Sequence, residues 1–484
     1  MKLIQSIPLF SILFSLLLLS PLVSSLPTID ITGYKFFNTE TETSIAWKGI
    51  DYYPRPNAGI LNVNNLDFFT TEYAHIWERD IVHLKALNIN AIRIYAVDPS
   101  KNHDAFMCAL DAAGIYVIVG MAAQCKGCAI GESEAPKCYP EELKKRGQLI
   151  IKAFARYSNT LAFSAGNEVN HYAPQGSSEV NAPCQKKFLR DMRAYIAGCP
   201  KMRAIPVGVV VADSDRTANA LYYNCNGDGD VYEHAEWYGI NVYLHCDASV
   251  ESSETAAGFK NLKNDFLAYG YSIPVMLTEF GCLSPSFPTV NGYEGQRAFK
   301  QAEWLYEAEF QKVFAGGFVF EYSTELVNSK STAPYPFTKF GPQNYGVGYF
   351  SPETCDDVTK PCIFNRMPNF NNLKDAYALP VEGSIARSVY TPSRTGRTTC
   401  PSQFPKLSEF SWSSENIENL LCPNRVSWSC TGTNPDVPPD NDFPASKDDD
   451  PKKDDDAKDD GNTSSGGSSL VVTTALVLFV AVAL

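Results

Sequence analysis

The sequence predicts an α/β fold: a (β/α)8 TIM barrel with a disulfide-linked, mostly irregular C-terminal extension. Between residues 43 and 328, eight apolar, β-rich runs alternate with longer amphipathic segments, the pattern of strands followed by helices. Several runs are almost continuously apolar, as parallel strands buried on both faces are. A doubly wound open sheet is the structural alternative. No Gly-rich phosphate loop follows the first run, which argues against nucleotide binding.

The expected barrel occupies residues 26–326. Its strands are expected at 44–52, 90–95, 115–120, 161–165, 204–211, 237–243, 274–278 and 317–322. Between most of them, hydrophobic residues recur at helical spacing. These amphipathic segments predict helices at 76–87, 104–113, 140–157, 186–196, 254–269 and 294–313.

The chain changes character after the last expected strand. Residues 327–433 are Pro-rich, lack a periodic pattern and contain five of the 14 cysteines. An even number of cysteines is typical of an oxidising compartment, so we expect loops that pack on the barrel and are tied to it by disulfides. Residues 434–469 are acidic and then rich in Ser and Gly. This composition predicts a disordered stalk.

Both ends of the chain indicate a protein exported to the outer face of a membrane. Residues 1–25 combine a cationic start, an apolar middle and small residues before the expected cleavage point, as secretory signal peptides do. The alternative is a retained membrane anchor. Residues 470–484 form a short apolar tail after small residues and a polar spacer, which is typical of a glycosylphosphatidylinositol (GPI) attachment sequence. Asn462 is the expected attachment residue, with Gly461 and Ser464 as alternatives, and a tail-anchor helix is the other possibility for the segment.

The charge distribution argues against nucleic acid as a partner. Of the formal net charge of -13, residues 434–460 supply -7 through eleven Asp and four Lys. The rest of the chain is mildly acidic and has no basic stripe of the kind nucleic-acid binding needs. Cys125 and Cys128 have the spacing of half a zinc site, but no second pair completes it. We therefore favour a disulfide there and expect no metal and no nucleic acid.

Two glutamates stand where barrel enzymes carry their chemistry. Glu168 follows the fourth apolar run, and Glu279 follows the seventh. In a barrel the strands end at one face, where active sites are built, and a carboxylate after a buried run is costly unless it has partners or a function. Two such groups about 5–5.5 Å apart are what a retaining glycosidase requires. The alternative for either glutamate is a salt bridge at the rim of the barrel.

The motifs around these glutamates resemble those of retaining glycosidases of the large (β/α)8 clan. More narrowly, the sequence resembles glycoside hydrolase family 72, the cell-wall β-1,3-glucanosyltransferases, over about residues 30–402. The similarity is carried by the segments 92–97, 163–169, 205–208, 238–243, 279–282 and 316–322. The eight-Cys carbohydrate-binding module of some members is absent, since only Cys422 and Cys430 follow Cys400.

The resemblance assigns roles to individual residues. It implies that Glu168 is the general acid/base and that Glu279 is the nucleophile forming a covalent glycosyl-enzyme. Asn167 is expected to contact the 2-hydroxyl of the sugar, a contact that strengthens in the transition state.

The resemblance also implies that three tyrosines contact the substrate: Tyr95, Tyr243 and Tyr322, each at a strand end. Aromatic faces pack on the C–H surfaces of sugars while their hydroxyls orient polar groups. Arg93 shares the face of its strand with Tyr95 and is expected to hold Glu279 ionised. A structural ion pair elsewhere is an equal alternative for Arg93.

Two disulfides are implied by the resemblance, Cys246–Cys282 between the loops after the sixth and seventh strands and Cys225–Cys400 to the extension. The sequence also departs from the family. Trp77 stands where fungal members carry the partner of Cys108, so we expect Cys108 to be free or paired with Cys125, Cys128 or Cys138. Tyr53 replaces an expected Gln, and residues 122–138 differ from the family's acceptor-side loop, which leaves the acceptor preference open.

The activity implied is that of a retaining β-1,3-glucanosyltransferase, a transglycosylase. It would cleave a β-1,3-glucan and transfer the retained fragment to the 3-hydroxyl of another glucan chain, with no cofactor. The implied partners are donor and acceptor glucan chains and a membrane reached through the GPI anchor, with a monomeric protein at the extracellular face of the plasma membrane and in the cell wall. The alternatives are a secreted retaining β-1,3-glucanase, a non-catalytic surface glucan-binding protein, and a surface receptor or adhesin.

Overall fold

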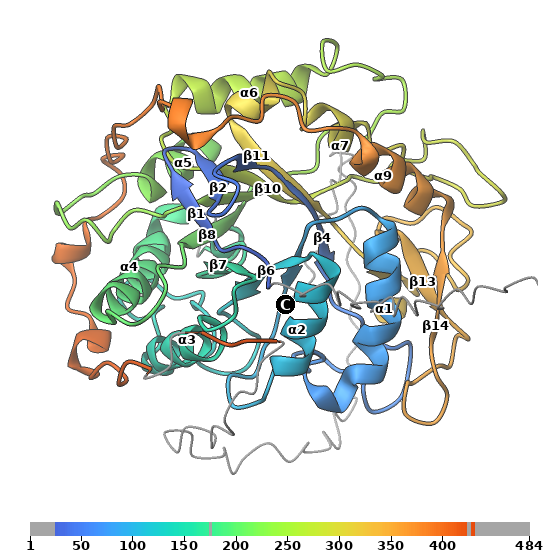
Figure 1. The fold of residues 1–484 in the computed structure, drawn as a ribbon, viewed down its shortest axis with the longest axis horizontal. Helices are drawn as coiled ribbons and strands as arrows, with labels where there is room; N and C mark the ends of the chain where they lie inside the picture. The colour runs from blue at the N-terminus through green and yellow to red at the C-terminus, as the bar shows by residue number, and fades with distance from the viewer. Residues whose placement is uncertain (1–24, 174–176, 424–426, 431–484) are drawn as a thin grey trace, which may run out of the picture.

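The computed structural model describes residues 25–173, 177–423 and 427–430. Eight parallel strands form a closed barrel in the order β10-β11-β4-β5-β6-β7-β8-β9, visible at the centre of Figure 1. This confirms the predicted fold class. The barrel strands are β4 (Trp47–Tyr52), β5 (Ala91–Ile94), β6 (Tyr116–Gly120), β7 (Thr160–Ser164), β8 (Val207–Ala212), β9 (Tyr238–Asn241), β10 (Val275–Phe280) and β11 (Phe314–Val319).

Helices surround the barrel (Figure 1). They are α1 (Ala74–Ala86), α2 (Asp104–Ala113), α3 (Glu141–Phe154), α4 (Ala182–Gly198), α5 (Arg216–Tyr223), α6 (Ala257–Ala268), α7 (Lys300–Trp304), the short α8 (Leu326–Ser329) and α9 (Pro368–Ala378). Single 3-10 turns lie at Thr71–Tyr73, Val169–Tyr172, Ser178–Val180, Phe310–Lys312, Arg387–Val389, Leu407–Glu409 and Ser413–Asn416. The apolar faces of the helices pack on the outside of the strands and form the main hydrophobic core.

Two elements around the eighth strand differ from the sequence expectation. The helix expected over residues 294–313 is reduced to α7 and one 3-10 turn. Gly295 has φ +64°, and the buried Arg297 donates from Nη1 to the carbonyls of Gly281 and Phe320. The start of this stretch therefore bonds the loops after β10 and β11 and does not form a helix. The strand expected over 317–322 lies at Phe314–Val319, because the chain leaves the barrel there and pairs elsewhere.

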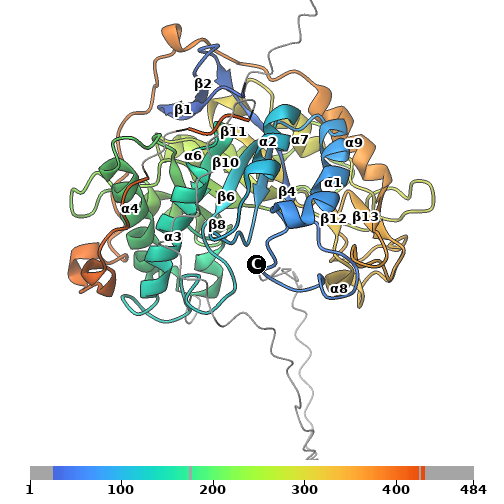
Figure 2. The ribbon, with the colours of Figure 1, turned by 60° about the horizontal axis from the view of Figure 1, so that its bottom comes forward.

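One end of the barrel is closed by the N-terminal sheet. Strands β1 (Ile29–Thr32), β2 (Lys35–Asn38) and β3 (Ser44–Ile45) form a small antiparallel sheet that lies across one end in Figure 2. Phe36 packs on Trp47, the first residue of β4, with ring centroids 5.5 Å apart. Below this contact the barrel interior is filled by a second core, which includes Ile118, Ala162, Val210, Trp237, Met276 and Phe318. In barrels of this type the active site lies at the opposite end, where the strands finish.

The C-terminal extension contains regular structure besides its loops. Strands β12 (Ser323–Thr324), β13 (Gly348–Ser351) and β14 (Ile363–Arg366) form a third sheet. Helix α9 then packs against the barrel: the Tyr377 hydroxyl donates to the carbonyl of Gly49 in β4 at 2.7 Å. Helical cover of the barrel therefore continues past residue 326, the boundary expected from the sequence.

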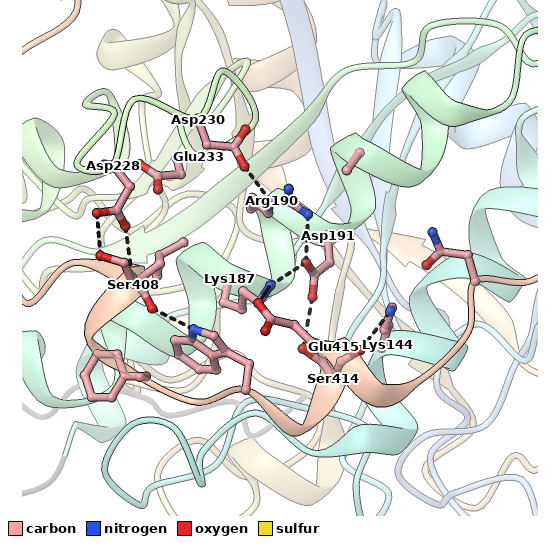
Figure 3. Close-up of a pocket in the computed structure, with 15 residues that line it drawn as sticks. Lys144, Lys187, Arg190, Asp191, Asp228, Asp230, Glu233, Ser408, Ser414 and Glu415 are labelled. Atoms are coloured by element: carbon pink, nitrogen blue, oxygen red, sulfur yellow. Dashed lines mark hydrogen bonds and ion pairs between the residues drawn. The ribbon is translucent and has the colours of Figure 1, made fainter.

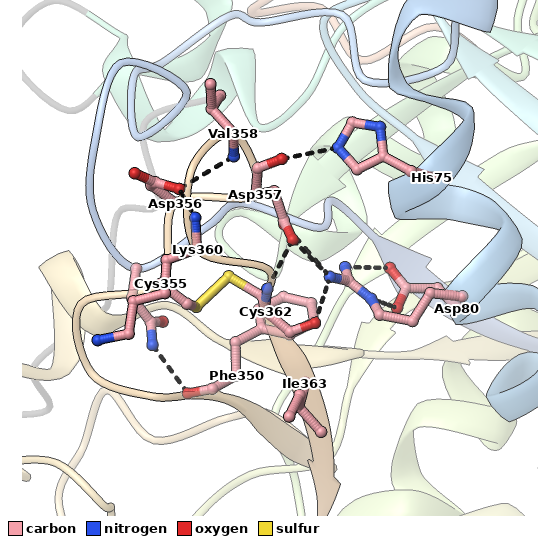
Figure 4. Close-up of polar contacts among 12 residues, drawn as sticks. His75, Asp80, Phe350, Cys355, Asp356, Asp357, Val358, Lys360, Cys362 and Ile363 are labelled. Carbon is pink, nitrogen blue, oxygen red and sulfur yellow. Dashed lines mark hydrogen bonds and ion pairs between the residues drawn. A yellow bond between two sulfur atoms is a disulfide. The ribbon is translucent and has the colours of Figure 1, made fainter.

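Polar contacts hold the extension on two helices. The loop closed by Cys355–Cys362 faces α1, where Arg79 Nη1 donates to Asp357 Oδ1 at 3.0 Å and His75 bonds the Asp357 carbonyl (Figure 4). Residues 407–419 face α4 across a polar cavity of about 510 Å³. There Lys187 lies between Asp191 and Glu415, at 3.1 and 3.0 Å (Figure 3).

Disulfides join the extension to the barrel at three places. The pairs are Cys108–Cys430, Cys199–Cys422 and Cys225–Cys400, with Cys125–Cys128, Cys138–Cys184, Cys246–Cys282 and Cys355–Cys362 elsewhere. The expectation for Cys108 was wrong: its three candidate partners are bonded to other cysteines, and it instead ties α2 to the end of the extension. No cysteine of the described residues is free.

Several sequence-based expectations fall outside the described residues. They are the signal peptide apart from Ser25, the stalk over 434–469, the tail over 470–484, and Asn462 as the attachment residue. Within the described ranges, none of the helices has the length and apolar character needed to cross a membrane. The same ranges contain no group of three or more His, Cys, Asp or Glu side chains placed to hold a metal ion.

Candidate active site

Glu279 lies in β10 at the open end of the barrel and is surrounded by hydrogen-bond donors. Its Oε1 accepts from Arg93 Nη1 at 3.0 Å and from the Tyr95 hydroxyl at 3.3 Å. Its Oε2 accepts from the Tyr243 hydroxyl at 2.9 Å. Burial and the charge of Glu279 raise the pKa of Tyr243 well above its ordinary value, so the phenol keeps its proton and donates. Only 8 % of Glu279 is exposed, and three donors favour its ionised form.

Arg93 is the cation at the centre of the site. Its Nη1 also donates to Asp51 Oδ1 at 3.2 Å and to the Tyr95 hydroxyl at 2.7 Å, and its guanidinium lies 4.5 Å from the Tyr95 ring centroid. Although burial opposes its charge, the neighbouring Tyr95, Asp51 and Glu279 raise the pKa of Arg93. The structure thus places Arg93 in an ion pair with Glu279, as expected. Arg93 also forms a second ion pair, with Asp51.

Glu168 follows β7 and has a different environment. Its backbone is left-handed, with φ 49°, and its amide donates to the carbonyl of Val210 in β8 at 3.0 Å, so the turn aims the side chain over the barrel. One side chain, Asn241 in β9, donates to Glu168 Oε1 at 2.9 Å. Burial and the charge of Glu279 raise the pKa of Glu168 to about 7. Near neutral pH this carboxyl group therefore holds a proton that it can give up.

A chain of hydrogen bonds joins the two glutamates. Asn241 Nδ2 donates to Glu168 and to Asn167 Oδ1, the second at 3.2 Å. Asn167 Oδ1 also accepts from Arg93 Nη2 at 2.7 Å, and Arg93 reaches Glu279 through its other nitrogen. Residues far apart in the sequence, on β5, β7, β9 and β10, thus form one cluster. The sequence-predicted Glu168, Glu279, Asn167, Arg93, Tyr95 and Tyr243 all belong to it.

Tyr322 does not join this cluster. Its ring is fully buried and stacks on Phe364 with centroids 4.3 Å apart. Its hydroxyl donates to Asp80 Oδ1 at 3.0 Å, and Asp80 also accepts from Tyr52 and Arg79. Strand β11 has ended before this residue, and the Tyr322 ring packs between Tyr52 of β4 and Phe364 of β14. Its surroundings are those of a structural residue, not of a group that contacts substrate.

Three residues of the site were missed by the sequence analysis. Asn241 bridges Glu168 and Asn167 and accepts from the Thr278 hydroxyl at 2.8 Å. Asp51, at 1 % exposure, lies beside Arg93, and Tyr345 packs on Tyr243 with ring centroids 5.7 Å apart. The signal for Asn241 was present, because it shares its side of the strand with Tyr243. Tyr345 comes from the Pro-rich extension, where no periodicity points to it.

A disulfide fixes the loops beside the nucleophile. Cys246 follows β9 and Cys282 follows β10, and the two are bonded; the resemblance implied this pairing. Gln301 of α7 donates to the carbonyls of Leu244 and His245 in the same loop, at 2.9 and 3.0 Å. The backbone that carries Tyr243 is therefore held on both sides.

Comparison with known proteins gives a consistent result. Residues 19–330 match the sequence model of the glucanosyltransferases of glycoside hydrolase family 72. The chain is 32% identical over 380 residues to the 1,3-beta-glucanosyltransferase GAS5 of Saccharomyces cerevisiae, covering 78% of this chain and 67% of that protein. It is 34% identical over 323 residues to the 1,3-beta-glucanosyltransferase PGA4 of Candida albicans, covering 66% and 65%. The chain thus spans about two thirds of the length of these relatives.

Solved structures are similar as well. A mutant of Saccharomyces cerevisiae Gas2p in complex with laminaritetraose and laminaripentaose matches with a TM-score of 0.59 at 26% identity, covering 79% of this chain and 75% of that one. The apo structure of a Gas2p mutant matches with a TM-score of 0.60 at 27% identity, covering 79% of this chain and 73% of that one.

Proposed function

We propose, because this chain belongs to the glucanosyltransferases of glycoside hydrolase family 72, that it is a retaining β-1,3-glucanosyltransferase. It cleaves a β-1,3-glucan chain and transfers the retained fragment to the 3-hydroxyl of another. The single observation that carries this proposal is the unequal pair of glutamates at the end of the barrel. Glu279 has three donors that favour its charge, whereas the pKa of Glu168 is raised to about 7.

In the first half of the reaction, Glu279 attacks the anomeric carbon of the donor and Glu168 gives its proton to the leaving oxygen. The bond from sugar to leaving oxygen breaks as the bond from sugar to Glu279 forms. Arg93, Tyr95 and Tyr243 hold the Glu279 carboxylate in position for this attack. Asn167, oriented by Arg93 and Asn241, is available for the 2-hydroxyl of the sugar.

In the second half, the 3-hydroxyl of an acceptor glucan attacks the glycosyl-enzyme, and Glu168, now ionised, takes its proton. Glu279 leaves as a carboxylate, and the configuration at the anomeric carbon is retained. Transfer exceeds hydrolysis when the acceptor hydroxyl is held closer to the reacting carbon than water is, a proximity effect. A β-1,3-glucanase would use the same two glutamates with water as acceptor.

The test is to incubate the purified protein with a laminari-oligosaccharide of one length and to size the products. We expect products longer than the substrate. If all products are shorter than the substrate, the protein is a hydrolase and not a transferase. If the substrate is bound but unchanged, the protein is a non-catalytic glucan-binding protein. Glu279→Gln is the control, because any product it forms comes from a contaminant.

We further propose that the protein is a monomer at the extracellular face of the plasma membrane and in the cell wall, anchored through GPI at Asn462 after removal of its signal peptide. The composition of residues 1–25 and 434–484 supports this. Release of the protein from intact cells by a phosphatidylinositol-specific phospholipase C tests the anchor. Retention of the Asn462→Gln variant at the surface would move the attachment to Gly461 or Ser464.

A further inference from the structure

Glu321 is a fourth carboxyl group at the open end of the barrel, in addition to Glu168, Glu279 and Asp51, and it has no use in the chemistry above. It follows β11 and is 8 % exposed. Its backbone is fixed on both sides, since its amide donates to the carbonyl of Tyr345 at 3.1 Å and its carbonyl accepts from Val347 at 3.0 Å. The backbone of Glu321 is therefore fixed against the segment of Tyr345 and Val347.

The carboxyl group of Glu321 has no direct hydrogen-bond or ion-pair partner, although it interacts through its charge with the buried Arg297. Among the described residues, none donates a hydrogen bond to its oxygens and none forms an ion pair with it. The next carboxylate along the chain shows the contrast, because Glu325 is paired with Arg55 at 3.4 Å and accepts from Asn328. A buried carboxyl group without a donor is unfavourable, so this one is placed to receive a partner from outside the chain.

The barrel order places Glu321 beside the strand of the nucleophile. Strand β11 neighbours β10, which carries Glu279, and lies across the barrel from β7, which leads to Glu168. Burial and the charges of Glu325, Asp51 and Glu279 raise the pKa of Glu321 well above its ordinary value, which agrees with a position near the nucleophile. Glu168 protonates the leaving oxygen, so the side opposite it holds the part of the donor that stays on the enzyme.

We propose that Glu321 is a substrate-binding residue whose carboxyl group hydrogen-bonds hydroxyl groups of the donor glucan on the non-reducing side of the cleaved bond. In a β-1,3-linked chain the 2-, 4- and 6-hydroxyls of every ring remain free, and a carboxyl group can bond two of them at once. This assignment rests on the proposed function and names a contact of that same site.

The test uses stability and binding together. Glu321→Met keeps the size of the side chain but removes the unpartnered carboxyl group. We expect it to raise the melting temperature and, in a Glu279→Gln background that cannot turn over, to weaken binding of laminaripentaose about tenfold by calorimetry. Glu321→Gln, which retains a donor and an acceptor, should keep most of the affinity.

The matched control is Glu325→Met, which leaves Arg55 without its carboxylate and should lower the melting temperature. A Glu321→Met variant that binds laminaripentaose as tightly as its parent would overturn the assignment, and so would one that loses stability, because the carboxyl group would then have a structural role. If the Glu279→Gln parent itself bound no laminaripentaose, the proposed function would fail, and this assignment with it. If Glu321→Met does not fold, Glu321→Ala takes its place, and undiminished binding of laminaripentaose by that variant would overturn the assignment.

Discussion

The ends of β7 and β10 carry the same residue type in the same barrel, yet they give it opposite properties. At the end of β10, Glu279 accepts from Arg93, Tyr95 and Tyr243. At the end of β7, Glu168 accepts from the amide of Asn241, and burial dominates the pKa of its carboxyl group. The difference teaches that neighbouring strands set the surroundings of each carboxyl group: Glu279 receives three donors, whereas burial with a single side-chain donor raises the pKa of Glu168.

The largest effect is expected from removing either carboxyl group. Glu168→Gln and Glu279→Gln should each lower turnover of laminari-oligosaccharides by at least about 10³-fold. A β-glucan glycoside with a dinitrophenolate leaving group separates the two roles, because that group departs without a proton. Release of dinitrophenolate, followed by absorbance, should persist in a first turnover of Glu168→Gln and be absent in Glu279→Gln. The reverse pattern would exchange the two assignments.

A smaller loss of activity is expected from Arg93→Lys, which keeps the positive charge beside Glu279 but loses the two-nitrogen geometry of the guanidinium. A lysine has a single nitrogen and cannot reach both Glu279 and Asn167 as Arg93 does. We expect kcat to fall by about 10–100-fold through misplacement of the nucleophile, with KM changed less. A variant with wild-type kcat would show that the site needs only a positive charge there.

The tyrosines allow a matched comparison of one substitution at two positions. Tyr243→Phe removes a donor from Glu279 and should lower kcat by about 10–100-fold, the loss of one hydrogen bond to a charged group. Tyr322→Phe removes a donor from the buried Asp80 and should lower the free energy of unfolding by about 1–3 kcal/mol while leaving kcat almost unchanged. Steady-state kinetics and urea unfolding of both variants measure the two effects. A strong fall in kcat for Tyr322→Phe alone would return that residue to the active site.

These positions also show what the sequence can and cannot reveal. The barrel was predictable because buried parallel strands are nearly continuous apolar runs. Glu168 lies shortly after one of these strands, and Glu279 is the last residue but one of another. The resemblance assigned Tyr322 to substrate contact. Because the sequence stays apolar past the end of β11, it does not show at which residue that strand ends. Strand β11 ends at Val319, three residues before Tyr322, and the Tyr322 side chain reaches Asp80.

The remaining parts of the site depend on contacts that no local pattern records. Asp51 and Asn241 matter because of which strands lie beside theirs, and Tyr345 reaches Tyr243 from a segment without periodicity. The same holds for Cys108, whose partner Cys430 is 322 residues away. Pairings of this kind follow from the closed fold and not from spacing along the chain.

The smallest effect concerns the pH dependence set by Asn241. Glu168 must be protonated to start cleavage, and its pKa is raised to about 7, so kcat/KM for the donor should fall as the pH rises through about 7. The hydrogen bond from Asn241 favours the ionised form and so lowers this pKa. Asn241→Ala should therefore move the falling limb to higher pH, by at most about one unit, since one hydrogen bond contributes on the order of 1 kcal/mol. Profiles of kcat/KM between pH 5 and 9 measure this, and a limb displaced to lower pH would mean that Asn241 acts on Glu168 by some other route than its hydrogen bond.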